Sequence, residues 1–253
     1  MIQTLSAPPT FRQDLADFWR FLRHPDLHRS PGRRAGGSLM SDWRPGVSFG
    51  RLLAWAAVLW FINAVLFGPL SLMVAQQLGA EHRLDAEHVP VLIAVLWAPM
   101  VEELLFRYGM RRPAQAWWMV PLAIVLVMHP LSVPGWILLA VVLLAACRPL
   151  RRGRISRGHW ASAWRREYVR VYGVVYHLVA LAFAAVHLHN FSFDKTTFWL
   201  LPFLVLPQWV TGLVLGWMRT RRGIGASMAL HALFNAGPVM LILLTLHFFP
   251  GSA

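Results

Sequence analysis

Charged residues and cysteines are scarce in this sequence. Only 14% of its 253 residues are charged, against about 25% in an ordinary soluble domain, while 57% are hydrophobic. Because Cys147 is the only cysteine, an intramolecular disulfide and a cluster of metal-bound thiolates are excluded. The apolar residues gather in long runs that are nearly free of charge, which excludes intrinsic disorder, a secreted disulfide scaffold and a soluble nucleic-acid binder.

Seven apolar runs follow a polar arm at residues 1–50. They lie at about 52–78, 90–108, 114–129, 133–147, 171–190, 197–218 and 224–248. Because a helix needs about 20 residues to cross a bilayer, the sequence predicts an all-α, polytopic transmembrane helical bundle of about seven spans in residues 51–253. The third and fourth runs are short, so we expect a tilted or re-entrant hairpin that turns at His129-Pro130 and Pro134-Gly135.

Acidic residues are also few: 11 Asp and Glu stand against 24 Lys and Arg, which gives a formal net charge of +13. The arm and alternate loops hold 22 of the 24 basic residues, at 1–51, 107–112, 148–170 and 219–222. The intervening loops hold only Arg83 and Lys195. This positive-inside pattern predicts a cytoplasmic N-terminus, with residues 79–89, residues 191–196 and the C-terminus outside. It also favours the lipid bilayer as partner over nucleic acid.

One piece of the basic arm has helical periodicity. Its apolar residues share one face, and they are Phe11, Leu15, Phe18, Trp19 and Leu22. Its charged residues are assigned to the other face, and they are Arg12, Asp14, Asp17, Arg20 and Arg23. The pattern is typical of an interfacial amphipathic helix on the membrane surface, or of a helix packed on the protein's own cytoplasmic face, and both interpretations stay open.

Ionisable side chains are rare inside the runs, because each costs about 2.5–3.5 kcal/mol at the centre of a bilayer. They are Glu102, Glu103 and Arg107 in the second run, His177, His187 and His189 in the fifth, and His231, with the amide Asn235, in the seventh. Glu103 and Arg107 are four residues apart and can pair, which leaves Glu102 without a local partner, as a general base requires. We interpret His177 as a core residue and His189 as a boundary residue.

Three motifs follow one another on separate runs: EELLFR (102–107), FAAVH (183–187) and HALFN (231–235). Taken alone, the His231 and Asn235 pair is explained as a contact between helices. Together and in this order, the motifs resemble the CAAX-protease and bacteriocin-processing (CPBP) family of intramembrane proteases. The resemblance covers roughly 90–110 and 175–240, and residues 114–170 look like an insertion. Counted from the cytoplasmic ends, however, Glu102 and His231 lie about seven residues deep, whereas His187 lies nearer the outer face.

The resemblance implies an intramembrane endopeptidase of the glutamate type. Glu102 would activate water with help from His187, and His231 and Asn235 would stabilise the oxyanion. Glu103, Arg107 and Phe183 would support these residues. No cofactor is expected. The alternative is a zinc metalloprotease in which His187, His231 and Glu103 hold the metal.

The expected substrate is a membrane-associated protein or peptide. The scarcity of lysine and the frequent Arg, Ala, Leu and Trp indicate a high-GC bacterial source, and hence the bacterial inner membrane. A sortase-like enzyme that processes C-terminal anchor signals is an alternative within the same family. Two rivals lie outside it: a non-enzymatic membrane scaffold or immunity protein, and a proton-coupled transporter.

Overall fold

The computed structural model describes residues 9–30, 42–83, 89–130, 132–147, 159–194 and 197–249. The α-helices are α1 Phe11–Arg23, α3 Phe49–Ile62, α4 Gly68–Leu78, α5 Ala98–Glu102, α6 Tyr108–Arg111, α7 Pro113–Met128, α8 Val133–Cys147, α9 His159–Val186, α10 Leu201–Leu204, α11 Leu206–Arg222 and α12 Ile224–Phe248. The π-helical segments are Asn63–Phe67, Ile93–Trp97 and Glu103–Arg107, and the 3₁₀ segments are His187–Asn190 and Phe198–Leu200. Two strands, β1 Ala80–His82 and β2 Phe191–Phe193, pair antiparallel.

Several helices have the length and hydropathy of membrane spans. Within the described residues, three qualify on their own: Phe49–Leu78, Ala163–Asn190 and Ile224–Phe248. A fourth qualifies if Phe198–Leu204 and Leu206–Arg222, bent by 51°, are counted as one span. These helices make the chain an integral membrane protein and confirm the all-α class. The count of seven spans stays a prediction, because α7 and α8 are shorter and the helical run 91–111 carries charges.

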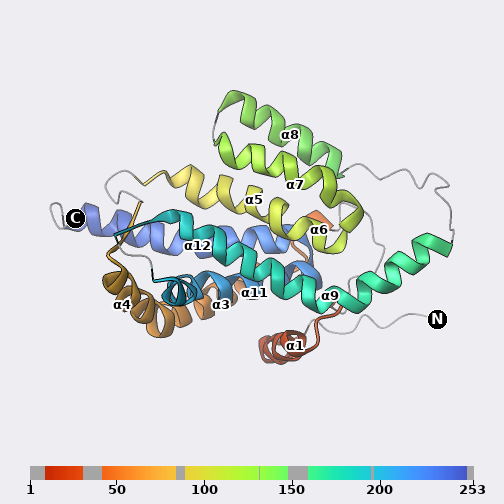
Figure 1. The fold of residues 1–253 in the computed structure, drawn as a ribbon, viewed down its shortest axis with the longest axis horizontal. Coiled ribbons are helices and arrows are strands. Elements are labelled where there is room, and N and C mark those ends of the chain that lie inside the picture. Colours follow the sequence, from red (N-terminus) through yellow and green to blue (C-terminus); the bar gives the residue numbers. More distant parts are fainter. Residues whose placement is uncertain are drawn as a thin grey trace.

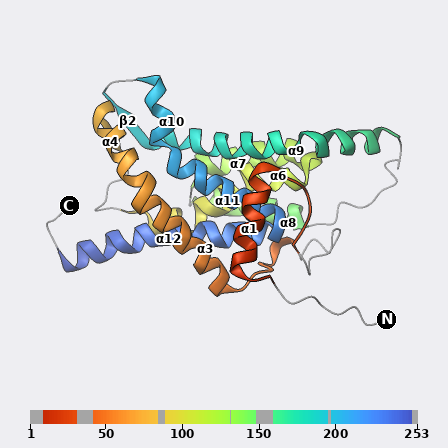
Figure 2. The same ribbon diagram turned by 90° about the horizontal axis from the view of Figure 1, so that it is seen from below.

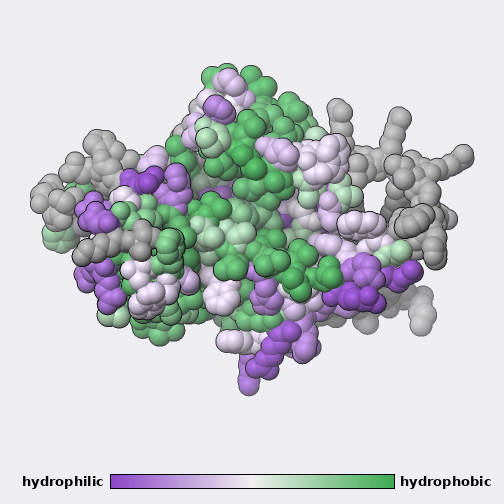
Figure 3. All heavy atoms as spheres, in the orientation of Figure 1, coloured by the Kyte–Doolittle hydropathy of each residue, from purple (hydrophilic) through white to green (hydrophobic). Residues whose placement is uncertain are grey.

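The helices run mostly along one axis. In Figure 1, α9 and α12 extend along the length of the molecule, and α7 and α8 lie side by side above α5. In both views α4 and the end of α12 lie at the left, whereas the start of α9 lies at the right (Figure 2). Figure 3 shows hydrophobic side chains over the middle of this face and hydrophilic ones toward its two ends. This distribution suits helices that cross a bilayer along the long axis.

Two helix boundaries differ from the sequence prediction. The sixth run was expected to be one span, but it breaks between α10 and α11, where Pro202 and Pro207 each occupy a first helical turn. Proline lacks an N–H and favours the start of a helix, so the break follows from these residues. Residues 159–170, assigned to a loop by their charge, form the first turns of α9 instead. The small β1–β2 sheet was not anticipated.

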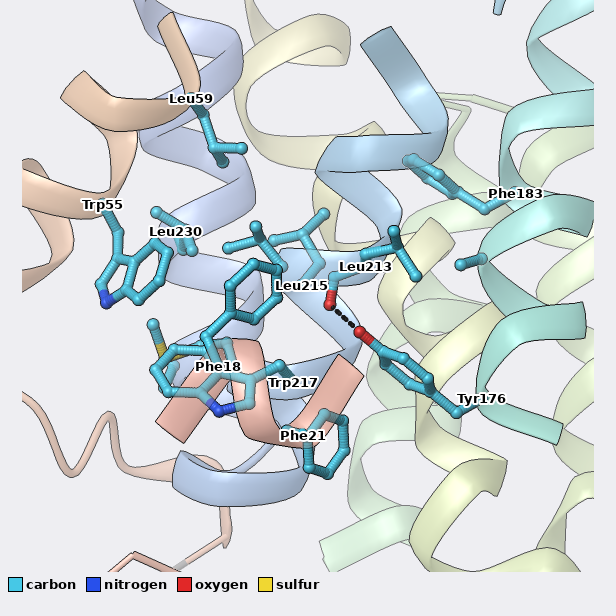
Figure 4. Close-up of a cluster of buried hydrophobic side chains, with 14 of the residues drawn as sticks. Phe18, Phe21, Trp55, Leu59, Tyr176, Phe183, Leu213, Leu215, Trp217 and Leu230 are labelled. Carbon is cyan, nitrogen blue, oxygen red and sulfur yellow. Dashed lines mark hydrogen bonds between the residues drawn. The ribbon is translucent and has the colours of Figure 1, made fainter. Parts of the chain in front are cut away.

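Helix α1 packs on the body of the protein. Phe18 lies beside Trp55 and Trp217, with ring centroids 5.5 and 5.8 Å away, and Phe21 is fully buried against Tyr176 (Figure 4). Of the expected apolar face, Phe11, Leu15, Phe18 and Leu22 pack on this core, whereas Trp19 is 61% exposed. Most apolar side chains of α1 therefore pack against α3, α9 and α11, on the surface of the protein itself.

Acidic residues of the arm bind the arginines that end α11. Asp14, which the sequence placed on the outer face, is buried and accepts hydrogen bonds from Arg51 at 2.8 Å and Arg222 at 3.0 Å. Asp17 lies 2.7 Å from Arg221. Asp14 lies on the inner face because a helix face that meets buried guanidinium groups must supply carboxylates. The arm thus supplies counter-ions to these arginines.

Asp42 forms the most enclosed of these ion pairs. Both of its oxygens accept from Arg219, which is 0% exposed and also donates to the backbone oxygens of Arg107 and Tyr108. Burial by itself would raise the pKa of Asp42, but the guanidinium groups of Arg219 and Arg29 outweigh it and hold the pKa below its usual value. Its contribution to stability is therefore present above the ordinary carboxyl pKa and is lost as the pH falls through the lowered one.

We predict that Asp42→Ala strongly destabilises the protein. The substitution leaves Arg219 buried without its counter-ion, which costs about 3–5 kcal/mol. The measurement is thermal unfolding in detergent. Glu167→Ala is the matched control, because Glu167 pairs with Arg170 on an exposed surface, where removal of a pair changes little. Equal unfolding midpoints for the two variants would contradict the prediction.

Candidate active site

The helical run 91–111 carries Glu102 and Glu103, and a proline shapes its first half. In the π-helical segment Ile93–Trp97, the N–H of Ala98 bonds to the oxygen of Ile93, five residues back. Residue 99 is proline and has no N–H. Neither position 98 nor position 99 therefore donates to the oxygen of Ala94, and the Asn235 amide does so instead, at 2.8 Å. Asn235 thus ties α12 to the run that carries the carboxylates.

Glu103 lies at the centre of a buried polar cluster. One oxygen lies 2.8 Å from Arg107 Nη1 and 3.1 Å from His231 Nδ1, and the other accepts from the hydroxyl of Ser227 at 2.5 Å. Both Glu103 and Arg107 are 0% exposed. The expected Glu103–Arg107 pair is present, and every oxygen of this carboxylate is occupied. Glu103 therefore serves to hold its neighbours in place.

Phe183 covers the charged side of this cluster. The guanidinium carbon of Arg107 lies 3.8 Å from the centre of the Phe183 ring, a cation–π contact. Arg107 Nε and Nη2 have no hydrogen-bond partner among the described residues, so the aromatic face is their main compensation. The same ring also packs against the imidazoles of His187 and His231, with centroids 4.6 and 5.7 Å away. Phe183 therefore fixes three of the polar side chains at once.

Glu102 differs from Glu103 in having no such partners. Its Oε2 is buried, lies 3.7 Å from His231 Nε2, and lacks a hydrogen bond to any described residue. The side chain lines a cavity of about 610 Å³. The other predicted residues that line the same cavity are Phe183, His187, His231 and Asn235. An unpartnered carboxylate at a cavity wall is suited to binding a water molecule or a substrate group.

Both histidines present the same ring nitrogen to this cavity. His187 Nδ1 lies 2.7 Å from the Phe183 backbone oxygen, which only accepts, so Nδ1 must carry the proton and donate. His231 Nδ1 faces the Glu103 carboxylate and donates in the same way. Nε2 of His231 then points toward Glu102. The neutral His187 ring therefore has an Nε2 that can accept a hydrogen bond from water.

The structure brings together all three motifs, although their depths appeared inconsistent in the sequence. Helix α9 begins at His159, twelve residues before the expected Val171, so a count from Val171 does not measure the depth of His187. His177 bonds to the backbone oxygen of Leu22 and lies apart from the cavity, as expected for a core residue. His189, expected at a boundary, is exposed and lines the cavity.

The sequence reasoning missed two residues at the site. Ser227 was noted only as a small residue, although it precedes His231 by four positions and its hydroxyl donates to Glu103. That spacing was a usable signal. Gln208 also lines the cavity, and its Oε1 is buried without a partner among the described residues. Its position follows from the helix break before α11, which Pro202 and Pro207 mark in the sequence.

Glu103 does not lie where the predicted zinc ligand set needs it. A metal held by His187 and His231 would have to use their Nε2 atoms, because Nδ1 is engaged in both rings. Glu103 lies on the Nδ1 side of His231, with its oxygens bound to Arg107 and Ser227. It therefore cannot complete the predicted ligand set. Within the described ranges, no three His, Cys, Asp or Glu side chains converge as metal ligands would.

Comparison with known protein families accounts for this set of motifs. The family model of type II CAAX prenyl endopeptidase Rce1-like proteins matches residues 85–237. The chain belongs to this family. The match includes all seven predicted site residues and runs through 114–170. No curated protein and no solved structure matches the chain. Membership in a protease family, on helices that can span a membrane, supports a peptidase that acts within the bilayer.

Proposed function

We propose that this Rce1-like protein is a glutamate-type intramembrane endopeptidase, and that Glu102 is its general base. The observation that carries the proposal is the Oε2 of Glu102, which is buried at the cavity wall, has no hydrogen-bond partner among the described residues and lies 3.7 Å from His231 Nε2. Water held between Glu102 and His187 gives a proton to Glu102 as its oxygen attacks the peptide carbonyl carbon. Glu102 then returns the proton to the leaving amine as the C–N bond breaks. No acyl-enzyme forms.

His231 and Asn235 are proposed to stabilise the oxyanion. The Glu103 carboxylate holds the His231 ring through Nδ1, and an Nε2–H of this ring would donate into the cavity. Asn235 uses one hydrogen of its amide on the oxygen of Ala94 and retains a second. Glu103, Arg107 and Phe183 position these donors. No metal or other cofactor takes part in the proposed reaction.

The proposed substrate is a membrane-associated protein or peptide in a bacterial inner membrane. A prenylated C-terminus is what the family name implies, but bacterial proteins offer few such groups. A leader peptide, a membrane peptide or a C-terminal anchor signal processed in a sortase-like manner fits the same site. A scaffold, an immunity protein or a proton-coupled transporter would give no cleavage. The cavity is lined by the motif residues themselves, which favours a single reaction centre over a proton path.

The direct test is a search for the product. Cells that produce the wild-type chain are compared with cells that produce Glu102→Gln, and the termini of all membrane proteins are mapped by mass spectrometry. We expect at least one new terminus that depends on Glu102. Identical sets of termini, with both proteins folded in the membrane, would contradict the peptidase assignment. The substrate found in this way then serves in the assays below.

Chelators should not affect turnover. Because Glu103 cannot join His187 and His231 around a metal, and the proposed mechanism uses none, removal of divalent metals is expected to leave the rate unchanged. The measurement is substrate cleavage by purified protein before and after dialysis against a chelator, with metal analysis of the same samples. Loss of activity that stoichiometric zinc restores would replace Glu102 catalysis with metal catalysis.

Asn235→Ala should slow the reaction more than it destabilises the protein. Loss of the hydrogen bond to Ala94 costs about 1 kcal/mol of stability, whereas loss of an oxyanion donor lowers kcat by about 10²–10³-fold. Asn63→Ala is the matched control, because Asn63 also donates to a backbone oxygen, that of Leu59, but lies outside the cavity. Both variants are compared for kcat and unfolding. If both retain the wild-type kcat, Asn235 acts only as a contact between helices.

A further inference from the structure

The cavity reaches one end of the molecule and not the other. From Glu102 it extends to the exposed side chains of Arg83, His189 and Asn190. These residues adjoin the β1–β2 sheet, in which the N–H of Arg83 donates to the oxygen of Asn190 at 2.8 Å. The lining includes none of the arginines at 107–112 or 219–222. A substrate can therefore reach Glu102 from the sheet end.

The opposite end is closed by packed side chains. Directly after Glu102 along the helix, Glu103, Leu104, Arg107 and Tyr108 are each 0% exposed. Arg219 lies beyond them and bonds to the oxygens of Arg107 and Tyr108. The ion pairs of the arm then cover Arg219. None of the five residues of this layer lines the cavity.

The closed end is also the arginine-rich end. It holds Arg51, Arg111 and the end of α11, whereas Arg83 is the only Arg or Lys in the described residues of the sheet end. Basic residues near spans mark the cytoplasmic side. The helix between the two ends has the length of a membrane span. Glu167 and His189 lie 22 residues apart along α9 and its 3₁₀ extension, or about 33 Å at 1.5 Å per residue. That is about the thickness of the hydrocarbon core.

We propose that the active site opens to the extracytoplasmic side of the membrane. The inference rests on the proposed function and narrows its substrate class: the scissile bond belongs to a translocated segment and lies at or just inside the outer boundary of the bilayer. A C-terminus modified in the cytoplasm, and presented from there, does not reach Glu102. Among the candidate substrates, leader peptides or anchor signals exposed outside the cytoplasmic membrane are favoured.

Cysteine accessibility tests the side of opening. In a Cys147→Ala background, which has no other cysteine, His189→Cys reports on the cavity mouth and Glu167→Cys on the other end of the same helix. Intact cells are treated with a membrane-impermeant maleimide, and a second sample is treated after permeabilisation. We expect His189→Cys to react in intact cells and Glu167→Cys to react only after permeabilisation. Both proteins are first checked for folding in the membrane.

Each other outcome overturns the proposal. Reaction of Glu167→Cys but not His189→Cys in intact cells would place the mouth in the cytoplasm. Failure of His189→Cys to react until the membrane is dissolved would show that the cavity opens to neither aqueous side. The labelling does not depend on catalysis, so a chain that labels as expected but cleaves nothing would refute the peptidase and leave the sidedness intact.

Discussion

The Glu102→Gln protein is expected to lose about 10²–10⁴-fold in turnover of its substrate. Glutamine keeps the shape of the side chain but cannot accept the proton of the attacking water. The unfolding midpoint should stay at the wild-type value, because Oε2 of Glu102 has no hydrogen-bond partner to lose among the described residues. Activity per folded molecule and thermal unfolding are measured on the same purified samples.

Glu167→Gln serves as the control for this experiment. It makes the same chemical change on an exposed part of α9, where Glu167 pairs only with Arg170. We expect wild-type turnover and stability for it. Full activity of folded Glu102→Gln would remove Glu102 from the mechanism, whereas equal loss in both variants would indicate an effect of charge unrelated to the cavity.

Glu103→Gln is expected to reduce both stability and activity. The amide brings hydrogens toward three donors, Arg107, Ser227 and His231, and leaves the buried guanidinium without a counter-ion. Breaking a buried pair in this way costs about 3–5 kcal/mol. His231 also loses the carboxylate that fixes its ring, so turnover should fall even when the protein is kept folded at low temperature.

A double substitution separates the two effects. Glu103→Gln combined with Arg107→Met removes both charges, so it should cost much less stability than the sum of the single changes. Turnover should remain low, because His231 is still unsupported. Additive losses of stability would show that Glu103 and Arg107 act independently, against the 2.8 Å contact between them.

The contacts in the site were predictable where both residues lie on the same helix. The four-residue spacings gave the Glu103–Arg107 pair and placed Phe183 with His187, and His231 with Asn235, toward one cavity. The hydrogen bond between Glu103 and His231 joins residues 128 positions apart. No local spacing contains it, so the separate tasks of the two glutamates became visible only in three dimensions.

The fold was predictable where hydrophobicity alone decides it. Long apolar runs gave the spans at Phe49–Leu78 and Ile224–Phe248. On α1 the inward face was predicted except for Trp19 and Asp14, and the burial of Asp14 depends on Arg222, 208 residues away. The break before α11 was missed because Pro202 and Pro207 lie within a long apolar run. Proline counts as apolar in a hydropathy pattern, although it has no N–H to donate to a helix.

The ion pairs of the arm also set an order of assembly during synthesis. Asp42 leaves the ribosome 177 residues before Arg219, its buried partner. At about 5–20 residues per second, Asp42 waits roughly 9–35 s for that arginine. Asp14 and Asp17 wait even longer for Arg222 and Arg221. The ion pairs of the segment made first thus form only when α11 has been made, so a chain that stops before α11 cannot complete the arginine-rich end.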